Sequence, residues 1–176
     1  MMLNNLENPK IISISEKKLI GNKLEMSFAD DKTFQLWSSF MPRHKEIQNR
    51  IGTHKFSLQN YGENFQSDPT IPFVKWALIE VLNYNYVPEA METYTINEGL
   101  FAVFTYNGPS KNAVQVFQYI YNVWLPNSSY ELDNREHFEI LGENYNPQGN
   151  AEEEIYIPIK LKLIYFSFIG ISTILR

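Results

Sequence analysis

Cysteine is absent from the 176 residues of this chain. Its absence excludes disulfide bonds, thiolate catalysis and zinc sites built on cysteine. Histidine is scarce as well: His44, His54 and His137 lie far apart and show none of the close pairings typical of metal ligands. No Gly-x-Ser-x-Gly elbow accompanies them, so nothing indicates a serine hydrolase. We therefore expect neither a metal site nor a cofactor.

Clustered basic residues are the second feature in short supply. The chain has 15 Lys and Arg against 20 Asp and Glu, and its basic segments, Lys17-Lys18 and 42–45, are short and isolated. Binding to a phosphate backbone needs a concentrated basic surface, so we expect no direct nucleic-acid binding. The start, "MMLNNLENPK", has no positive segment followed by an apolar one and predicts no signal peptide. A cytoplasmic protein is the expectation.

Long apolar runs are missing except in "LIYFSFIGISTIL", residues 163–175. A membrane-spanning helix needs about 20 apolar residues, so this run is too short to predict a membrane anchor. Its β-branched and aromatic residues favour an added strand or an appended segment, and it is a candidate for homodimerisation. We therefore divide the chain into a domain at 1–160 and an apolar tail of unknown role at 161–176.

Aromatic residues, at 15% of the chain, are the abundant feature. They fill cores, and they also line cavities for flat or lipophilic ligands. In the first half, hydrophobic periodicity predicts strands at 10–15 and 23–28, a helix bent at Pro42, and strands at 55–61 and 71–84. The dipeptide Gly21-Asn22 predicts a turn between the first two strands.

The second half repeats this order. It predicts extended chain at 91–108, a helix at 110–126 that stops at Pro126, and strands at 137–145 and 152–160. Two copies of β-α-β-β, at about 9–84 and 91–160, predict an α+β domain with pseudo-twofold repeats. We expect a mostly antiparallel sheet, both helices on one face, and a ligand groove between the repeats.

Two predicted strands carry acids among apolar residues. In "KWALIEV", Glu80 shares a strand face with Trp76. In "EEEIYIPIK", Glu154 and Tyr156 share one face, while the isoleucines take the other face and should lie under the helices. We expect Glu154 to look into an open face beside Glu80.

A carboxylate placed among aromatic rings needs a cation, hydrogen-bond donors or water. Such a group is suited to a lipophilic cation, or to general-base catalysis with a tyrosine as the acid. By contrast, Glu152 and Glu153 are expected to form the solvated start of the strand.

Five segments carry a family resemblance: "LWSSFMPRHKEIQNRIG", "FVKWALIEV", "VPEAMETYTINEGLFAVFTYNG", "YIYNVWLPNSSYELDNREHFEILGENY" and "EEEIYIPIK". Together they resemble the GyrI-like small-molecule-binding domain, related to the effector-binding domains of AraC-type and MerR-type multidrug-sensing regulators. The resemblance runs from about Pro9 to Lys160. It implies a duplicated β-α-β-β fold whose groove binds bulky cationic or aromatic compounds through a strand glutamate, which matches Glu154.

The resemblance leaves three hypotheses for function. The preferred one is stand-alone binding of lipophilic, aromatic or cationic small molecules for sensing, sequestration or detoxification. The second is a hydrolase of cyclopropane-type electrophiles, in which Glu154 activates water and Tyr156 is the candidate acid. The third is a protein-interaction or gyrase-inhibitory module. The candidate ligand-binding residues are Glu154, Glu80, Trp37, Trp76, Tyr61, Tyr121, Tyr145 and Tyr156.

Overall fold

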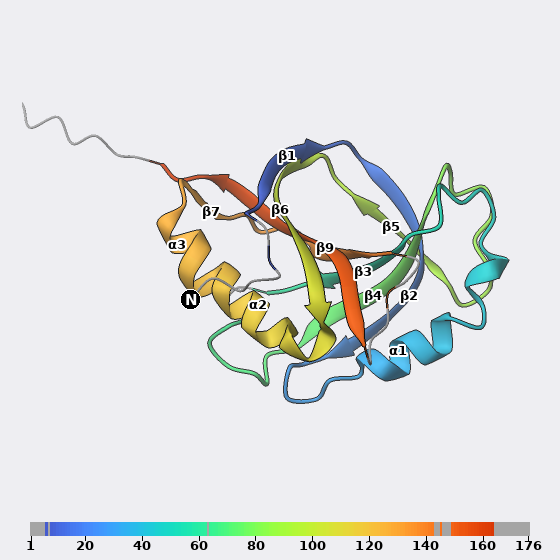
Figure 1. Cartoon of the computed structure of the whole chain (residues 1–176). Helices are drawn as coiled ribbons and strands as arrows, with labels where there is room; N and C mark the ends of the chain where they lie inside the picture. The colour runs from blue at the N-terminus through green and yellow to red at the C-terminus, as the bar shows by residue number, and fades with distance from the viewer. Residues whose placement is uncertain (1–5, 7, 63, 143–144, 146–148, 164–176) are drawn as a thin grey trace, which may run out of the picture.

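The computed structural model of the chain describes residue 6 and residues 8–62, 64–142, 145 and 149–163 (Figure 1). Within these residues a nine-stranded antiparallel sheet carries short helices. The strands are β1 (Lys10–Ile14), β2 (Lys17–Met26), β3 (Lys55–Asn60), β4 (Phe73–Val81), β5 (Glu92–Ile96), β6 (Gly99–Pro109), β7 (Tyr130–Leu132), β8 (His137–Leu141) and β9 (Asn150–Leu161). The helical segments are α1 (Thr33–Phe40), η1 (His44–Glu46), η2 (Ser110–Asn112), α2 (Ala113–Tyr119), the π-helical η3 (Ile120–Trp124) and α3 (Leu125–Asn127).

The sheet has the predicted pseudo-twofold organisation. Strands β3 and β8 pair at its centre, and the order β3-β4-β2 on one side repeats as β8-β9-β6 on the other. Each half also gives its leading strand to the other half, because β1 pairs with β6 and β5 pairs with β2. The predicted α+β fold with a mostly antiparallel sheet is confirmed.

The predicted turn at Gly21-Asn22 is wrong, because both residues lie inside β2. Gly21 is there for a different reason. It is paired with Leu78 of β4, and a Cβ atom added to Gly21 would collide with the backbone carbonyl oxygen of Ala77. A glycine within a strand often marks such a close approach of two backbones.

The two helices lie on the same side of the sheet, as expected (Figure 1). The isoleucines of β9 pack under α2 and η3, where Ile155 and Ile157 join Val116 and Ile120 in one buried cluster. Residues of α1 form a matching cluster with β2 and β4. The alternation in β9 therefore predicted its helix-covered face correctly.

The opposite face was expected to be open, and this is wrong where the predicted aromatic residues lie. Trp76 and Tyr156 are only 7% and 8% exposed and belong to an apolar core with Phe101 and Phe138. Figure 1 shows why: the sheet curves strongly, and β1 and β5 lie on the side away from α1 and α2. The aromatic residues of that face are therefore covered, although Glu154 at its edge is exposed.

No helix in the described ranges is long and apolar enough to cross a membrane. The predicted apolar tail begins at the last residue of β9, Leu161, and residues 164–176 lie outside the described residues. The suggested homodimerisation through that tail stays a prediction.

Candidate ligand-binding groove

The helices leave part of their face of the sheet uncovered between α1 and α2, and there a groove crosses the centre of the sheet. Two adjoining cavities, of about 430 and 700 Å³, lie along it. They share Thr33 of α1, Ala113 and Phe117 of α2, and the strand residues Lys75 and Glu139. Cavities of about 300–1,000 Å³ are typical of sites for drug-sized ligands.

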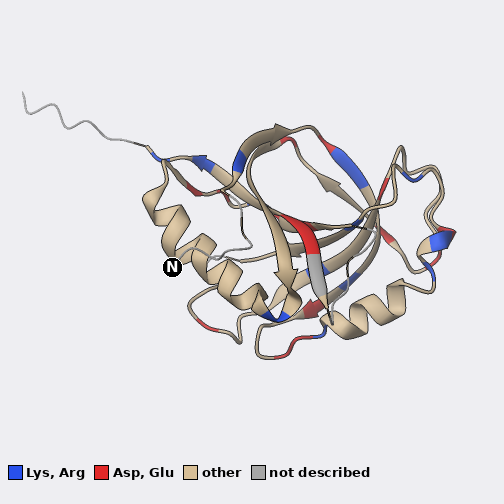
Figure 2. Ribbon diagram, in the orientation of Figure 1, with Lys and Arg blue, Asp and Glu red and all other residues tan. Residues whose placement is uncertain are grey.

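The walls of the groove are uncharged. Neither α1 nor the continuous segment from α2 through η3 contains Lys, Arg, Asp or Glu (Figure 2). Phe34, Trp37 and Met41 line one wall, and Phe117 lines the other. Phe34 is 84% exposed, so the apolar lining continues to the surface of the molecule. Such walls suit an aromatic or aliphatic ligand body.

Three charged residues lie on the floor of the groove near its centre, and Lys55 and Asp31 line it farther out. On β8, Glu139 is paired with Ser57 of β3 at the centre of the sheet. Gln59 and Leu141 each follow a residue of that central pair by two positions. On the neighbouring strands, Lys75 of β4 is paired with Gln59, and Glu153 of β9 is paired with Leu141. Lys75 and Glu153 therefore occupy equivalent positions in the two halves, with opposite charges.

Glu139 is a buried carboxylate with little compensation. Its side chain is 9% exposed, and its Oε2 accepts a hydrogen bond of 3.0 Å from Nε2 of Gln59. Gln59 also donates to Ser57, while its own Oε1 has no partner among the described residues. Within the described residues, Glu139 forms no ion pair. A buried carboxylate in this state strongly favours an incoming cation.

The carboxyl group of Glu153 has a pKa close to neutral pH. Burial and, to a smaller extent, nearby Glu139 raise the pKa of its carboxyl to about 7, with Lys75 opposing both effects. Tyr145 lines the same cavity, and burial raises the pKa of its hydroxyl to about 12. Near neutral pH this part of the groove can therefore exchange a proton through Glu153 and donate a hydrogen bond from Tyr145.

The far end of the groove is rich in aromatic side chains. Tyr61 stacks on Phe65 with ring centroids 4.2 Å apart, and the ring of His137 lies 5.0 Å from Tyr61. A hydrogen bond of 2.9 Å joins the hydroxyl of Tyr121 to Nδ1 of His137. Burial, with a smaller effect from Arg135, lowers the pKa of His137 to about 3, so its ring stays neutral at physiological pH.

Residues 7–160 match the profile of the GyrI-like small molecule binding domain. The chain belongs to the GyrI-like family. Its relatives include the transcriptional regulator BrlR of Pseudomonas aeruginosa, which is 29% identical over 152 residues. The match covers 85% of this chain and 54% of BrlR, so the chain spans about half the length of that relative.

Solved structures share the GyrI-like fold at low sequence identity. An integron cassette protein from the mobile metagenome of Vibrio cholerae aligns with a TM-score of 0.66 at 16% identity, over 89% of this chain and 98% of that one. The structure of SAV2435 bound to tetraphenylphosphonium aligns with a TM-score of 0.61 at 11% identity, over 88% of this chain and 94% of that one.

The groove of this GyrI-like domain contains half of the predicted ligand-binding residues. Those that line its cavities are Trp37, Tyr61, Tyr121 and Tyr145. The other four, Trp76, Glu80, Glu154 and Tyr156, lie on the opposite face of the sheet.

On that opposite face, the carboxylates of Glu80 and Glu154 and the hydroxyl of Tyr156 already have partners. Glu80 forms an ion pair of 3.0 Å with Lys17. The hydroxyl of Tyr156 donates a hydrogen bond of 2.9 Å to Glu154, and its ring stacks on Phe138 at 4.4 Å. The ligand-binding and catalytic roles of these residues stay predictions.

The glutamates that line the groove are Glu139 and Glu153, and Asp31 lines its second cavity. The expectation that Glu153 forms a solvated strand start is wrong. It lies on the same face as Ile155 and Ile157, but the gap between α1 and α2 leaves it in a cavity. The sequence did carry a signal for Glu139, which sits among apolar residues in "HFEIL" just as Glu80 does in "ALIEV".

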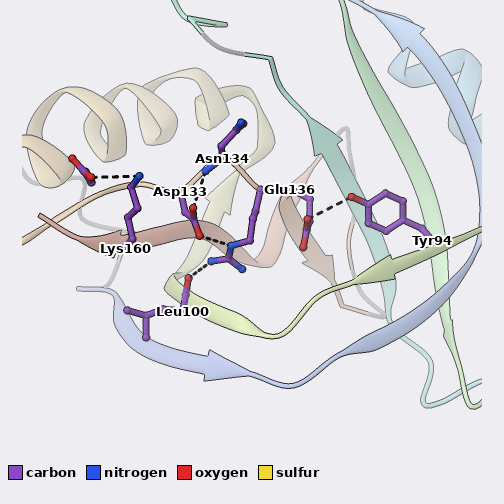
Figure 3. Close-up of polar contacts among 8 residues, drawn as sticks. Tyr94, Leu100, Asp133, Asn134, Glu136 and Lys160 are labelled. Atoms are coloured by element: carbon purple, nitrogen blue, oxygen red, sulfur yellow. Dashed lines mark hydrogen bonds and ion pairs between the residues drawn. The ribbon is translucent and has the colours of Figure 1, made fainter. Parts of the chain in front are cut away.

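A second polar cluster lies away from the groove and holds loops together (Figure 3). Arg135 donates to Asp133 at 2.6 Å and to the carbonyl of Leu100 at 2.7 Å, and its guanidinium lies 4.5 Å from the centre of the Phe101 ring. Figure 3 shows the hydroxyl of Tyr94 directed at buried Glu136, 3.5 Å away. These contacts tie the segment before β8 to β5 and β6, which is a structural role.

We expect Glu153→Gln to change how stability depends on pH. The folded protein keeps this carboxyl protonated up to about pH 7, whereas the unfolded chain ionises it from its ordinary value of 4.5. The free energy of unfolding therefore falls between these two pH values and is flat above them. At pH 8 the variant should be more stable than the parent by on the order of 1 kcal/mol, and at pH 4 it should be unchanged.

Urea titrations at both pH values measure this difference. Glu152→Gln is the matched control, because Glu152 is exposed and adjacent. Equal effects of the two substitutions at pH 8 would show that folding does not raise the pKa of Glu153.

Proposed function

We propose that this GyrI-like domain binds lipophilic aromatic cations in the groove between α1 and α2, for sensing, sequestration or detoxification. Glu139 supplies the counter-charge, and Glu153 supports it from the neighbouring strand. The observation that carries the proposal is the buried carboxylate of Glu139, which forms no ion pair among the described residues, on the floor of a groove whose helices are uncharged and rich in aromatic residues.

The buried carboxylate and the apolar walls together favour a cation with an apolar surface. Such a cation loses little hydration on entry and gains both the carboxylate and the apolar walls. A ring such as Trp37 adds cation-π attraction on the order of 0.5–2 kcal/mol. The presence of tetraphenylphosphonium in the related SAV2435 supports this ligand class. The similarity to BrlR supports an effector-binding role in transcription regulation.

The test compares a cation with a neutral compound of similar shape. We expect isothermal titration calorimetry to show micromolar binding of tetraphenylphosphonium, equivalent to about −8 kcal/mol. Neutral triphenylphosphine oxide should bind at least about tenfold more weakly, because it brings no charge to Glu139. Equal affinities would overturn the role of the carboxylate, and no binding of either compound would overturn the proposal.

The hydrolase alternative has one observation in its favour. Glu153, with a pKa of about 7, is suited to general acid-base catalysis and shares its cavity with Tyr145. Mass analysis of compounds recovered after incubation separates the two functions. Compounds of unchanged mass support binding, whereas a cyclopropane-type electrophile that gains one water supports hydrolysis.

A further inference from the structure

Lys75 is the feature of the groove that cation binding does not explain. It lies on β4, faces the helices, and lines both cavities, as Glu139 does. Within the described part of the chain its ammonium group forms no ion pair. The nearby Asp31 uses its carboxylate to accept the backbone N–H of Thr33 at 2.8 Å. The positive charge of Lys75 acts on Asp31 and Glu153, and its side chain lines both cavities, where a ligand can reach it.

A simple cation gains nothing from Lys75. The ammonium repels it and partly cancels the field of Glu139 and Glu153, since Lys75 already opposes the raised pKa of Glu153. A groove for monocations alone would be better served by a neutral residue at this position. Lys75 offsets the acids around it, Asp31 and Glu153, and it also offers a positive group to a ligand that carries a negative one.

The duplicated floor shows how two opposite charges would be held. Lys75 and Glu153 occupy equivalent positions in the two halves, on either side of the central pair Ser57 and Glu139. A ligand that crosses the groove between Trp37 and Phe117 therefore meets Glu153 on one side and Lys75 on the other, while Lys55 and Asp31 line the same cavities farther out. Charge complementarity selects a molecule with the reverse arrangement.

We propose that the groove is specific for amphoteric aromatic compounds, whose cationic centre lies at Glu139 and Glu153 and whose acidic group lies at Lys75. This inference rests on the proposed function and defines its ligand class more narrowly. The polar and charged floor fixes the orientation of the ligand, and the uncharged helices hold its flat body.

The test uses a matched pair of dyes. Rhodamine B carries a delocalised cation and a free carboxylate, and its ethyl ester has the same ring system with the carboxylate blocked. We expect the parent protein to bind rhodamine B at least as tightly as the more lipophilic ester, measured by fluorescence polarisation. Lys75→Met should weaken rhodamine B at least about fivefold and should tighten both the ester and tetraphenylphosphonium.

The controls separate this inference from the proposed function. Lys75→Arg keeps the positive charge and should keep the preference for the free acid, which also guards against a folding artefact in the methionine variant. If Lys75→Met tightens both dyes equally, or if tetraphenylphosphonium binds and neither dye does, the amphoteric inference is overturned while cation binding stands. If neither tetraphenylphosphonium nor a dye binds, both proposals are wrong.

Discussion

Gly21→Ala is expected to destabilise the protein by about 3 kcal/mol or more and to lower Tm by about 6–12 °C. The new methyl group meets three backbone atoms of β4: the carbonyl oxygen and carbon of Ala77 and the Cα of Leu78. Backbone atoms in a paired strand cannot turn aside as a flexible side chain can. The clash is relieved only by separating β2 from β4, which form one of the longest pairings in the sheet.

Differential scanning calorimetry measures the loss, and Gly62→Ala is the control. A Cβ atom on Gly62 meets nothing within 4 Å, so its Tm should stay within about 2 °C of the parent value. A Gly21→Ala protein that melts with the Gly62→Ala control would show that β2 can shift without cost.

Most of the fold could be predicted because its signals are local. Isoleucine alternation in β9 and the break at Pro42 after α1 both follow from residues close in sequence. The prediction of a turn at Gly21-Asn22 failed because the signal that decides its structure is not local. The same dipeptide is a turn signal locally, whereas its role here depends on Ala77, which is far away in the chain and adjacent in the sheet.

The site was predicted only in part, and the reason is geometric. Alternation states which residues share a strand face, but it does not state where the cover of that face is interrupted. Glu153 and Glu154 have the same neighbours in sequence, yet only Glu153 lies on the groove side. Lys75 had no local signal, since a lysine within a strand is usually exposed. The aromatic walls were easier, because Trp37 lies on an apolar helical stripe that faces the cavity.

Glu139→Gln is expected to weaken binding of tetraphenylphosphonium about 30- to 100-fold, equivalent to about 2–3 kcal/mol. Glutamine keeps the volume of the side chain, and its amide oxygen can still accept from Gln59, so the loss reports the charge alone. Because the substitution also removes a buried charge without an ionic partner, the unliganded variant should be as stable as the parent or slightly more stable. A structural role for Glu139 would instead lower both stability and affinity.

Glu154→Gln is the decisive companion to this variant, since Glu154 was the carboxylate singled out by the sequence. It lies on the same strand as Glu153 but on the other face, with its Oε2 bonded to Tyr156. We expect its affinity for tetraphenylphosphonium to stay within about twofold of the parent value. The reverse result, a large loss with Glu154→Gln and none with Glu139→Gln, would move the binding site to the opposite face. Because the hydroxyl of Tyr156 donates to Glu154, Tyr156→Phe would then alter binding as well.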